Sequence, residues 1–173
     1  MTSATIDQDT FKAIMANAPG PATVVTAFDA AGRPHGLTVS AVCSVSLEPP
    51  LALACLDLGS NTLAALRESK SFTINYLADG RHEVALGFAT KSGTKFDGHS
   101  WTAPEGKIGG PILVDHVAAH ASCELETLID AGDHVIAVGR VVEGSAHEVL
   151  HALAYARRQF FTGRDVVIEG DGR

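Results

Sequence analysis

The 173-residue sequence has no run of 18 apolar residues, so we expect no membrane-spanning helix. Its first residues, MTSATIDQDTF, lack the basic and apolar regions of a secretory signal peptide. Only 19% of the residues are charged, and the acidic excess gives a net charge of −7. Because nucleic acids are bound by clustered positive charge, this balance argues against a nucleic-acid partner. We therefore expect a cytoplasmic protein that binds neither a membrane nor a nucleic acid.

Cysteine is scarce, and two common glycine motifs are missing. Cys43, Cys55 and Cys123 each stand in an apolar stretch, without a C-x-x-C pair, so we expect buried, reduced thiols. The segment GKIGGP has glycines but lacks the strand before it and the helix after it that a phosphate-binding loop needs. No G-x-S-x-G elbow occurs. The sequence thus indicates neither a Rossmann unit nor a serine hydrolase.

The residues that are present predict one mainly β domain spanning 1–173. Hydrophobic residues make up 46% of the chain, enough for a real core, while the low charged fraction favours a homo-oligomer. Short helices are expected in DQDTFKAIMANAPG, SNTLAALRES and GRHEVALGFAT. Strands are expected in ATVVTAF, LALACL, SFTINYL, VAAHASCELETLI, DHVIAVGRVVEG and VVIEGDGR. Many closely spaced strands with few helices indicate a β-barrel with helical covers.

Residues 36–50, GLTVSAVCSVSLEPP, alternate between an apolar row and a row of small hydroxyls. The apolar row holds Leu37, Val39, Ala41, Cys43, Val45 and Leu47, and the hydroxyl row holds Thr38, Ser40, Ser44 and Ser46. Small hydroxyls let a ligand lie close to the backbone, whereas an ordinary solvent face carries long charged side chains. Because typical strands have about five or six residues, we expect a break or bulge near Ala41–Cys43.

The segment HEVLH, residues 147–151, matches the zincin motif, in which two histidines and a glutamate form a hydrolytic zinc site. Such a site needs a third protein ligand, and the best-placed acid downstream, Glu169, lies in a tail rich in glycine and charge. We favour a short connecting helix with ordinary histidines. His116 and His120 are also four residues apart, but on one regular strand they would lie about 13 Å apart and could not share a metal.

Two further segments allow a functional or an ordinary interpretation. Lys91 and Lys95 flank small residues just after an expected helix, where they suit a phosphate or form a solvated turn. Asp133 and His134 begin a strand directly after a turn, which is compatible with the mouth of a pocket or with a structural histidine.

Taken together, five segments resemble one family. GLTVSAVCSVSLEPPLALACL, SNTLAALRESKSFTINYL, GFATKSGTKF, AGDHVIAVGRV and YARRQF are similar, in this order and spacing, to the flavin reductase components of two-component flavin-dependent monooxygenases. The resemblance covers residues 8–161 and leaves 162–173 as a tail. It implies an FMN-binding split β-barrel with Greek-key-like order, formed as a homodimer. It also implies hydride transfer from NADH or NADPH to FMN or FAD, and delivery of reduced flavin to a separate monooxygenase.

The resemblance also implies roles for individual residues. Flavin contacts carried over from the family's motifs are Leu37, Thr38, Ser40, Ala41, Cys55, Leu56, Asp57, Asn61, Thr62, Phe88 and Lys95. The nicotinamide would stack near His134, the catalytic candidate, with Tyr155 and Arg158 associated with the pyridine nucleotide. A non-catalytic flavin- or ligand-binding barrel is the alternative, and the zinc hydrolase is a weaker one.

Overall fold

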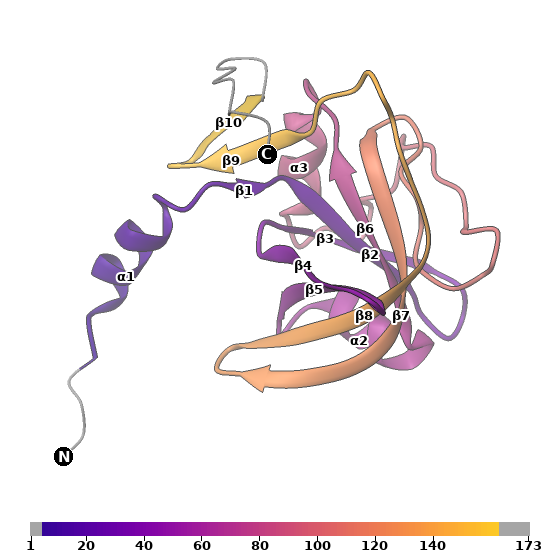
Figure 1. Ribbon diagram of the computed structural model, residues 1–173. Coiled ribbons are helices and arrows are strands. Elements are labelled where there is room, and N and C mark those ends of the chain that lie inside the picture. The colour runs from indigo at the N-terminus through magenta and orange to yellow at the C-terminus, as the bar shows by residue number, and fades with distance from the viewer. Residues whose placement is uncertain (1–4, 163–173) are drawn as a thin grey trace.

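The computed structural model describes residues 5–162, and its main element is one curled, seven-stranded antiparallel sheet (Figure 1). Its neighbours run in the order β3-β2-β6-β7-β8-β5-β4. The strands are β2 (Thr23–Phe28), β3 (Pro34–Val39), β4 (Val42–Leu47), β5 (Pro50–Asp57), β6 (Ser71–Leu77), β7 (Val117–Ala131) and β8 (His134–Ala146). The pairs β2–β6 and β5–β8 join strands that are not consecutive in the chain, as in Greek-key barrels.

The chain passes directly from one edge of this sheet to the other. β3 and β4 are the two edge strands, and only Ser40 and Ala41 separate them. Three Cα–Cα steps cover at most about 11 Å, so the two edges must lie close together and the sheet must curl into a barrel. The Ala41 carbonyl accepts a hydrogen bond from the Cys55 amide at 3.0 Å, which holds this corner to β5.

A second, three-stranded sheet lies outside the barrel, in the order β1-β9-β10. It contains β1 (Gly20–Pro21), β9 (Leu153–Ala156) and β10 (Gln159–Thr162). Figure 1 shows this sheet to the left of α3, while α1 (Gln8–Met15) stands away from the barrel at the start of the chain. None of the α1 residues is buried.

Two of the helices within residues 5–162 begin at a capping side chain. Asp7 caps α1 by accepting hydrogen bonds from the Asp9 and Thr10 amides, and Ser60 caps α2 (Asn61–Ser69) through the Thr62 and Leu63 amides. The buried face of α2 packs on one hydrophobic cluster of the barrel, and α3 (His82–Phe88) packs on a second through Val84, Ala85 and Phe88. No helix within residues 5–162 has the length and apolar character needed to cross a membrane.

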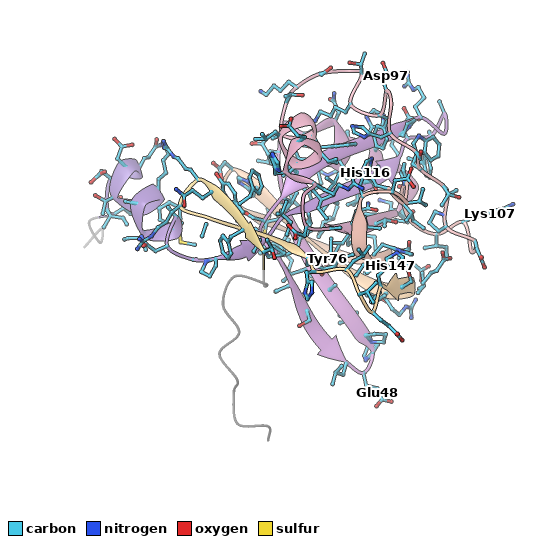
Figure 2. All side chains as sticks on the ribbon, turned by 90° about the horizontal axis from the view of Figure 1, so that it is seen from above. Glu48, Tyr76, Asp97, Lys107, His116 and His147 are labelled. Carbon is cyan, nitrogen blue, oxygen red and sulfur yellow. The ribbon has the colours of Figure 1, made fainter. Side chains whose placement is uncertain are left out.

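Buried polar side chains attach the long loop between α3 and β7 to the barrel. Asn75 donates to the carbonyl oxygens of Val24 and Pro111 and accepts from the Leu113 amide at 2.9 Å. Gly110 lies so close to β2 that a Cβ there would come within 2.2 Å of the Thr26 carbonyl oxygen. Figure 2 shows the outer part of the loop, with Asp97 and Lys107, far from α1.

The structure matches most of the expected elements and corrects several details. The break in residues 36–50 falls at Ser40–Ala41, which begins one residue before the expected range and overlaps it at Ala41, and a further bulge lies between Ser44 and Ser46. The two long strands β7 and β8 meet in a turn at Gly132–Asp133, slightly later than expected. The strand expected in VVIEGDGR lies outside the described residues.

The predicted apolar row of residues 36–50 is wrong beyond the corner. Cys43 and Val45 are exposed, and Leu47 is 95% exposed near the tip of the β4–β5 hairpin. Figure 2 shows Glu48, the next residue, at the end of this projecting hairpin. The reason is that β4 is an edge strand, so one of its faces has no layer above it. Of the three thiols, Cys43 on this edge strand is exposed, Cys55 is half-buried and Cys123 is buried, so the expectation of buried thiols holds fully for Cys123 alone.

The helix expected at HEVLH is also wrong, because residues 147–151 form an irregular connection between β8 and β9. His147 and His151 therefore lack the helical spacing that the zincin motif requires. His116 precedes β7 rather than lying within it, and its Nε2 atom is 3.0 Å from Nδ1 of His99. Within residues 5–162, no three His, Cys, Asp or Glu side chains are grouped to hold a metal ion.

Candidate functional site

A groove runs between the barrel and the β9–β10 hairpin. Its deeper part has a volume of about 210 Å³ and its outer part about 140 Å³. The deeper part is lined by Ala22, Thr38, Val39, Ser40, Ala85, Leu86, Ala89, Tyr155 and Phe160. The outer part is lined by Met15, Ala16, Ala18, Ser40, Tyr155, Ala156, Arg157 and Arg158. Because both parts share Ser40 and Tyr155, they form one continuous groove.

The barrel side of the groove is the end of β3. Thr38 donates its hydroxyl to the Ala85 carbonyl oxygen at 2.6 Å, which joins β3 to α3. Ser40 is exposed at the corner, and a Cβ on the neighbouring Gly20 would lie 3.0 Å from the Ser40 carbonyl oxygen. The small side chains at positions 20 and 40 therefore keep the groove open where the chain turns from β3 to β4.

The opposite side of the groove is the β9–β10 hairpin. The rings of Tyr155 and Phe160 pack against each other, with centroids 4.9 Å apart. Arg157 and Arg158 form the turn, with φ values of 49° and 62°. Residues other than glycine rarely adopt this left-handed conformation, so the surrounding contacts must hold the turn in place. The guanidinium of Arg158 is a cation beside an otherwise largely apolar groove.

Lys95 and Phe88 lie behind the groove rather than along its lining. The Lys95 ammonium donates to the carbonyl oxygens of Gly36 and Phe88, both at 3.0 Å. Partial burial lowers the pKa of this ammonium from its ordinary value. Phe88 is fully buried and meets Phe96 edge to face, and a Cβ on Gly36 would come within 2.6 Å of its ring. Lys95 therefore ties β3 to the end of α3, two residues from Thr38.

A second group of predicted residues lies on the other side of the Ser40–Ala41 corner. Asp57 pairs with His134 across β5 and β8, and the Leu58 amide donates to the Asp133 carbonyl oxygen at 3.1 Å. Ala41 joins this group through its hydrogen bond with the Cys55 amide, at 3.0 Å. The corner is thus the point that connects the groove to the β5–β8 rim.

His134 forms a carboxylate–imidazole pair with its neighbour. Its Nδ1 atom is 2.7 Å from Oδ1 of Asp133, and this hydrogen bond lowers the pKa of the Asp133 carboxyl. Because the ionised carboxylate only accepts, Nδ1 carries the proton in this hydrogen bond. The His134 side chain is 45% exposed, so the ring is available to a ligand.

Not every predicted contact can use its side chain. Leu56 and Thr62 are buried, and Leu37 packs against the barrel core, so these three could contribute only backbone groups to a ligand. Ser60 already accepts from the Thr62 and Leu63 amides at the beginning of α2, whereas Asn61 is exposed. The helix terminus is thus less open to a phosphate than its sequence suggested.

Sequence reasoning missed several groove residues, including Ala22, Ala85, Leu86, Ala89 and Phe160. Four of them are plain apolar residues of expected elements, and nothing in their local pattern separates a groove wall from a core contact. Phe160 carried one usable signal, because it lies inside the YARRQF segment together with Tyr155 and Arg158.

The fold and the groove define a class of protein: a split antiparallel β-barrel with a groove at its rim, lined mainly by small and apolar residues and by two arginines. Comparison with known proteins specifies the family. The family model for the flavin reductase like domain matches residues 15–164, and this chain belongs to that family. The predicted resemblance is thereby confirmed.

Individual relatives agree with this assignment. The NADH flavin reductase of Kitasatospora aureofaciens is 41% identical over 157 residues, which cover 90% of this chain and 81% of the relative. The reductase subunit HsaB of a flavin-dependent monooxygenase from Rhodococcus jostii is 34% identical over 155 residues, which cover 90% of this chain and 77% of HsaB. This chain spans only 44% of the length of a probable flavin reductase from Rhizobium meliloti.

Solved structures confirm the predicted split barrel. The NADH:FAD oxidoreductase SgcE6 of Streptomyces globisporus, in complex with NAD and FAD fragments, superposes with a TM-score of 0.84. It is 26% identical and covers 98% of this chain and 100% of its own. The enzyme class predicted from the sequence, an NAD(P)H-dependent flavin reductase with flavin and nicotinamide cofactors, is confirmed by the family and its members.

Proposed function

We propose that this chain reduces FMN or FAD with a hydride from NADH or NADPH and supplies the reduced flavin to a separate monooxygenase. The observation that carries the proposal is the groove, which brings Thr38, Ser40, Tyr155 and Arg158 together from segments more than 100 residues apart. The relation to HsaB, a reductase subunit of a monooxygenase, supports the second half of the proposal. A cytoplasmic location belongs to the same proposal.

In this proposal the flavin lies over the Ser40–Ala41 corner. Small side chains and exposed backbone at the corner suit the close approach of a flat ring system, which larger side chains would block. From the corner, one direction leads along β3 toward Lys95, and the other leads to Asp57 and His134 on the β5–β8 rim. The described residues therefore fit a flavin with its phosphate toward Lys95.

Lys95 can bind a phosphate without giving up its structural role. An ammonium group has three donors, and the carbonyl oxygens of Gly36 and Phe88 occupy two of them. The third donor and the positive charge remain for an anionic oxygen. Exposed Asn61 at the beginning of α2 is a second polar candidate for the same end of the ligand.

The chemistry of the reaction resides in the cofactors: bound flavin accepts a hydride at N5 directly from the nicotinamide C4. The protein has to hold two rings in contact and exclude water. Tyr155 and Phe160 supply an aromatic wall, and Arg158 supplies a cation for the phosphates of the pyridine nucleotide. His134, oriented by Asp133, offers Nε2 as a hydrogen-bond partner for the nicotinamide carboxamide.

A homodimer is the second part of the proposal. Large apolar side chains remain exposed on β4 and α1, including Leu47, Phe11 and Ile14. Together with the low charged fraction, they leave more apolar surface than an isolated monomer needs. Sedimentation of the purified chain as an 18.0 kDa monomer only would contradict the dimer.

The direct test is NADH and NADPH oxidation by the purified chain with added FMN, FAD or riboflavin. We expect turnover that depends on both the nicotinamide nucleotide and the flavin. The measurement is the decrease in absorbance of the reduced nicotinamide. A chain that binds flavin but oxidises neither nucleotide would instead be a flavin-binding barrel without this activity.

The variant Lys95→Met tests the phosphate contact while keeping the apolar stem of the side chain. We expect the apparent KM for FMN to rise about tenfold to a hundredfold, because a charge-assisted hydrogen bond contributes roughly 1.5–3 kcal/mol. Riboflavin, which has no phosphate, is the control ligand and should be affected little. Equal losses for both flavins would assign Lys95 to stability alone.

The variant His134→Ala tests the nicotinamide contact. We expect kcat/KM for NADH to fall about tenfold to a hundredfold, comparable to one or two hydrogen bonds, with little change in flavin affinity. Asp133→Ala is the matched variant, because it keeps the imidazole and removes only its orienting partner. A lower melting temperature with normal turnover per folded molecule would make His134 a structural residue.

The variant Arg158→Gly separates binding from stability. Glycine adopts the φ of 62° without strain, so the melting temperature should stay constant or rise. Loss of the guanidinium should raise KM for the nicotinamide nucleotide about tenfold, since a charged hydrogen bond is lost. Arg158→Lys keeps the charge and should retain part of the affinity. An unchanged KM in Arg158→Gly would remove this residue from the site.

A further inference from the structure

Asn17 links the end of α1 to the turn of the β9–β10 hairpin. Its Oδ1 atom accepts hydrogen bonds from both Nε, at 2.8 Å, and Nη2 of Arg157. Beside it, the Arg157 amide donates to the Ala16 carbonyl oxygen at 2.9 Å. Three hydrogen bonds therefore join two segments that are about 140 residues apart in the sequence.

The orientation of the Asn17 amide is fixed on both sides. Its Nδ2 atom donates to the Ala13 carbonyl oxygen at 2.8 Å, within the last turn of α1. Arginine carries only donors, so the atom that faces Arg157 must be the amide oxygen. Each polar atom of the amide thus has a partner, one in the helix and one in the hairpin.

Leu153 and Phe160 pack the strands of the hairpin against the second hydrophobic cluster, and the Asn17–Arg157 bonds add a contact at its turn. The hairpin belongs to the small sheet, in which β1 contributes only Gly20 and Pro21 to the pairing with β9. Its turn holds two arginines in the left-handed conformation, which is unfavourable for residues other than glycine, so a contact at the turn helps to hold it. Met15 of α1 and Arg158 of the hairpin both line the outer part of the groove, so the Asn17–Arg157 link joins two elements that border it.

We propose that Asn17 is a positioning residue for the nucleotide-binding groove. It acts through Arg157, which holds the hairpin so that Tyr155 and Arg158 line the groove opposite Ser40. The inference rests on the proposed function in one respect: the ligand that it positions is the nicotinamide nucleotide. Asn17 itself does not line the groove and has no part in the hydride transfer.

The test compares Asn17→Ala, Arg157→Ala and the double variant by their dissociation constants for NAD⁺, measured by calorimetry. We expect each single variant to weaken binding about five- to tenfold, as the loss of one or two hydrogen bonds does, and kcat to stay within about twofold. The double variant should be no weaker than either single one, because both remove the same link. Lys12→Ala, on the same helix but away from the groove, is the control and should bind normally.

Hydrogen exchange supplies a second measurement that does not depend on activity. The hairpin amides of residues 153–162 should exchange faster in Asn17→Ala than in the wild type and in Lys12→Ala. The positioning role would be overturned by an unchanged dissociation constant for NAD⁺ in the single variants. Additive effects in the double variant would also overturn it, as would weaker binding without faster hydrogen exchange. A wild-type chain that binds NAD⁺ but reduces no flavin would refute the proposed function and still allow this comparison. Absence of any NAD⁺ binding in the wild type would refute both.

Discussion

The two-residue link between β3 and β4 is the constraint on which the rest of the structure depends. Because Ser40 and Ala41 have to connect opposite edges of a seven-stranded sheet, the sheet curls, and the corner comes to the rim of the barrel. Both groups of candidate site residues meet at this corner. Thr38 and the hairpin lie on one side of it, and Cys55, Asp57 and His134 lie on the other. A longer connection would have left the edges apart and the groove without a floor.

Contacts from several elements hold the parts of the barrel around the groove together. Lys95 and Thr38 use carbonyl oxygens of α3 and its end to hold β3 against that helix. Asn75 attaches the long loop from the opposite side of the sheet. The hairpin packs on the second hydrophobic cluster through Leu153 and Phe160, and Arg157 holds its turn to the end of α1. Within the described residues, hydrogen bonds and hydrophobic packing therefore both hold the walls of the groove.

The sequence predicted the positions of helices and strands better than it predicted which of their faces are buried. Asp7, Ser60 and the alternating strands gave local signals, and the structure has the helices and strands that they indicate. The long run after Gly36 predicted a break, but period-two alternation could not show that β4 is an edge strand, so Cys43 and Leu47 were wrongly placed in the core. HEVLH has good helical spacing, yet the connection from β8 to β9 keeps it irregular. Pairing between strands that are distant in the sequence determines the burial of β4 and the conformation of residues 147–151.

The same limit applies to the site. Thr38, Ser40 and Tyr155 were predicted through motifs, whereas Ala85, Ala89 and Phe160 gained their place only when α3 and the hairpin met β3. The link between Asn17 and Arg157 joins distant segments and had no local signal at all. Residues whose role comes from their neighbours in space, rather than along the chain, stayed outside what the pattern could predict.

The position of the Lys95 ammonium has an entropic consequence. A surface lysine loses rotational freedom when it closes on an anion, and that loss reduces the affinity that its charge provides. Lys95 has already lost this freedom on folding, because two carbonyl oxygens hold its ammonium in place. Its partial burial also means that part of its hydration shell was removed on folding. The charge is thus preorganised. The conformational entropy of the Lys95 side chain is lost when the chain folds, so its loss does not reduce the affinity for an anion.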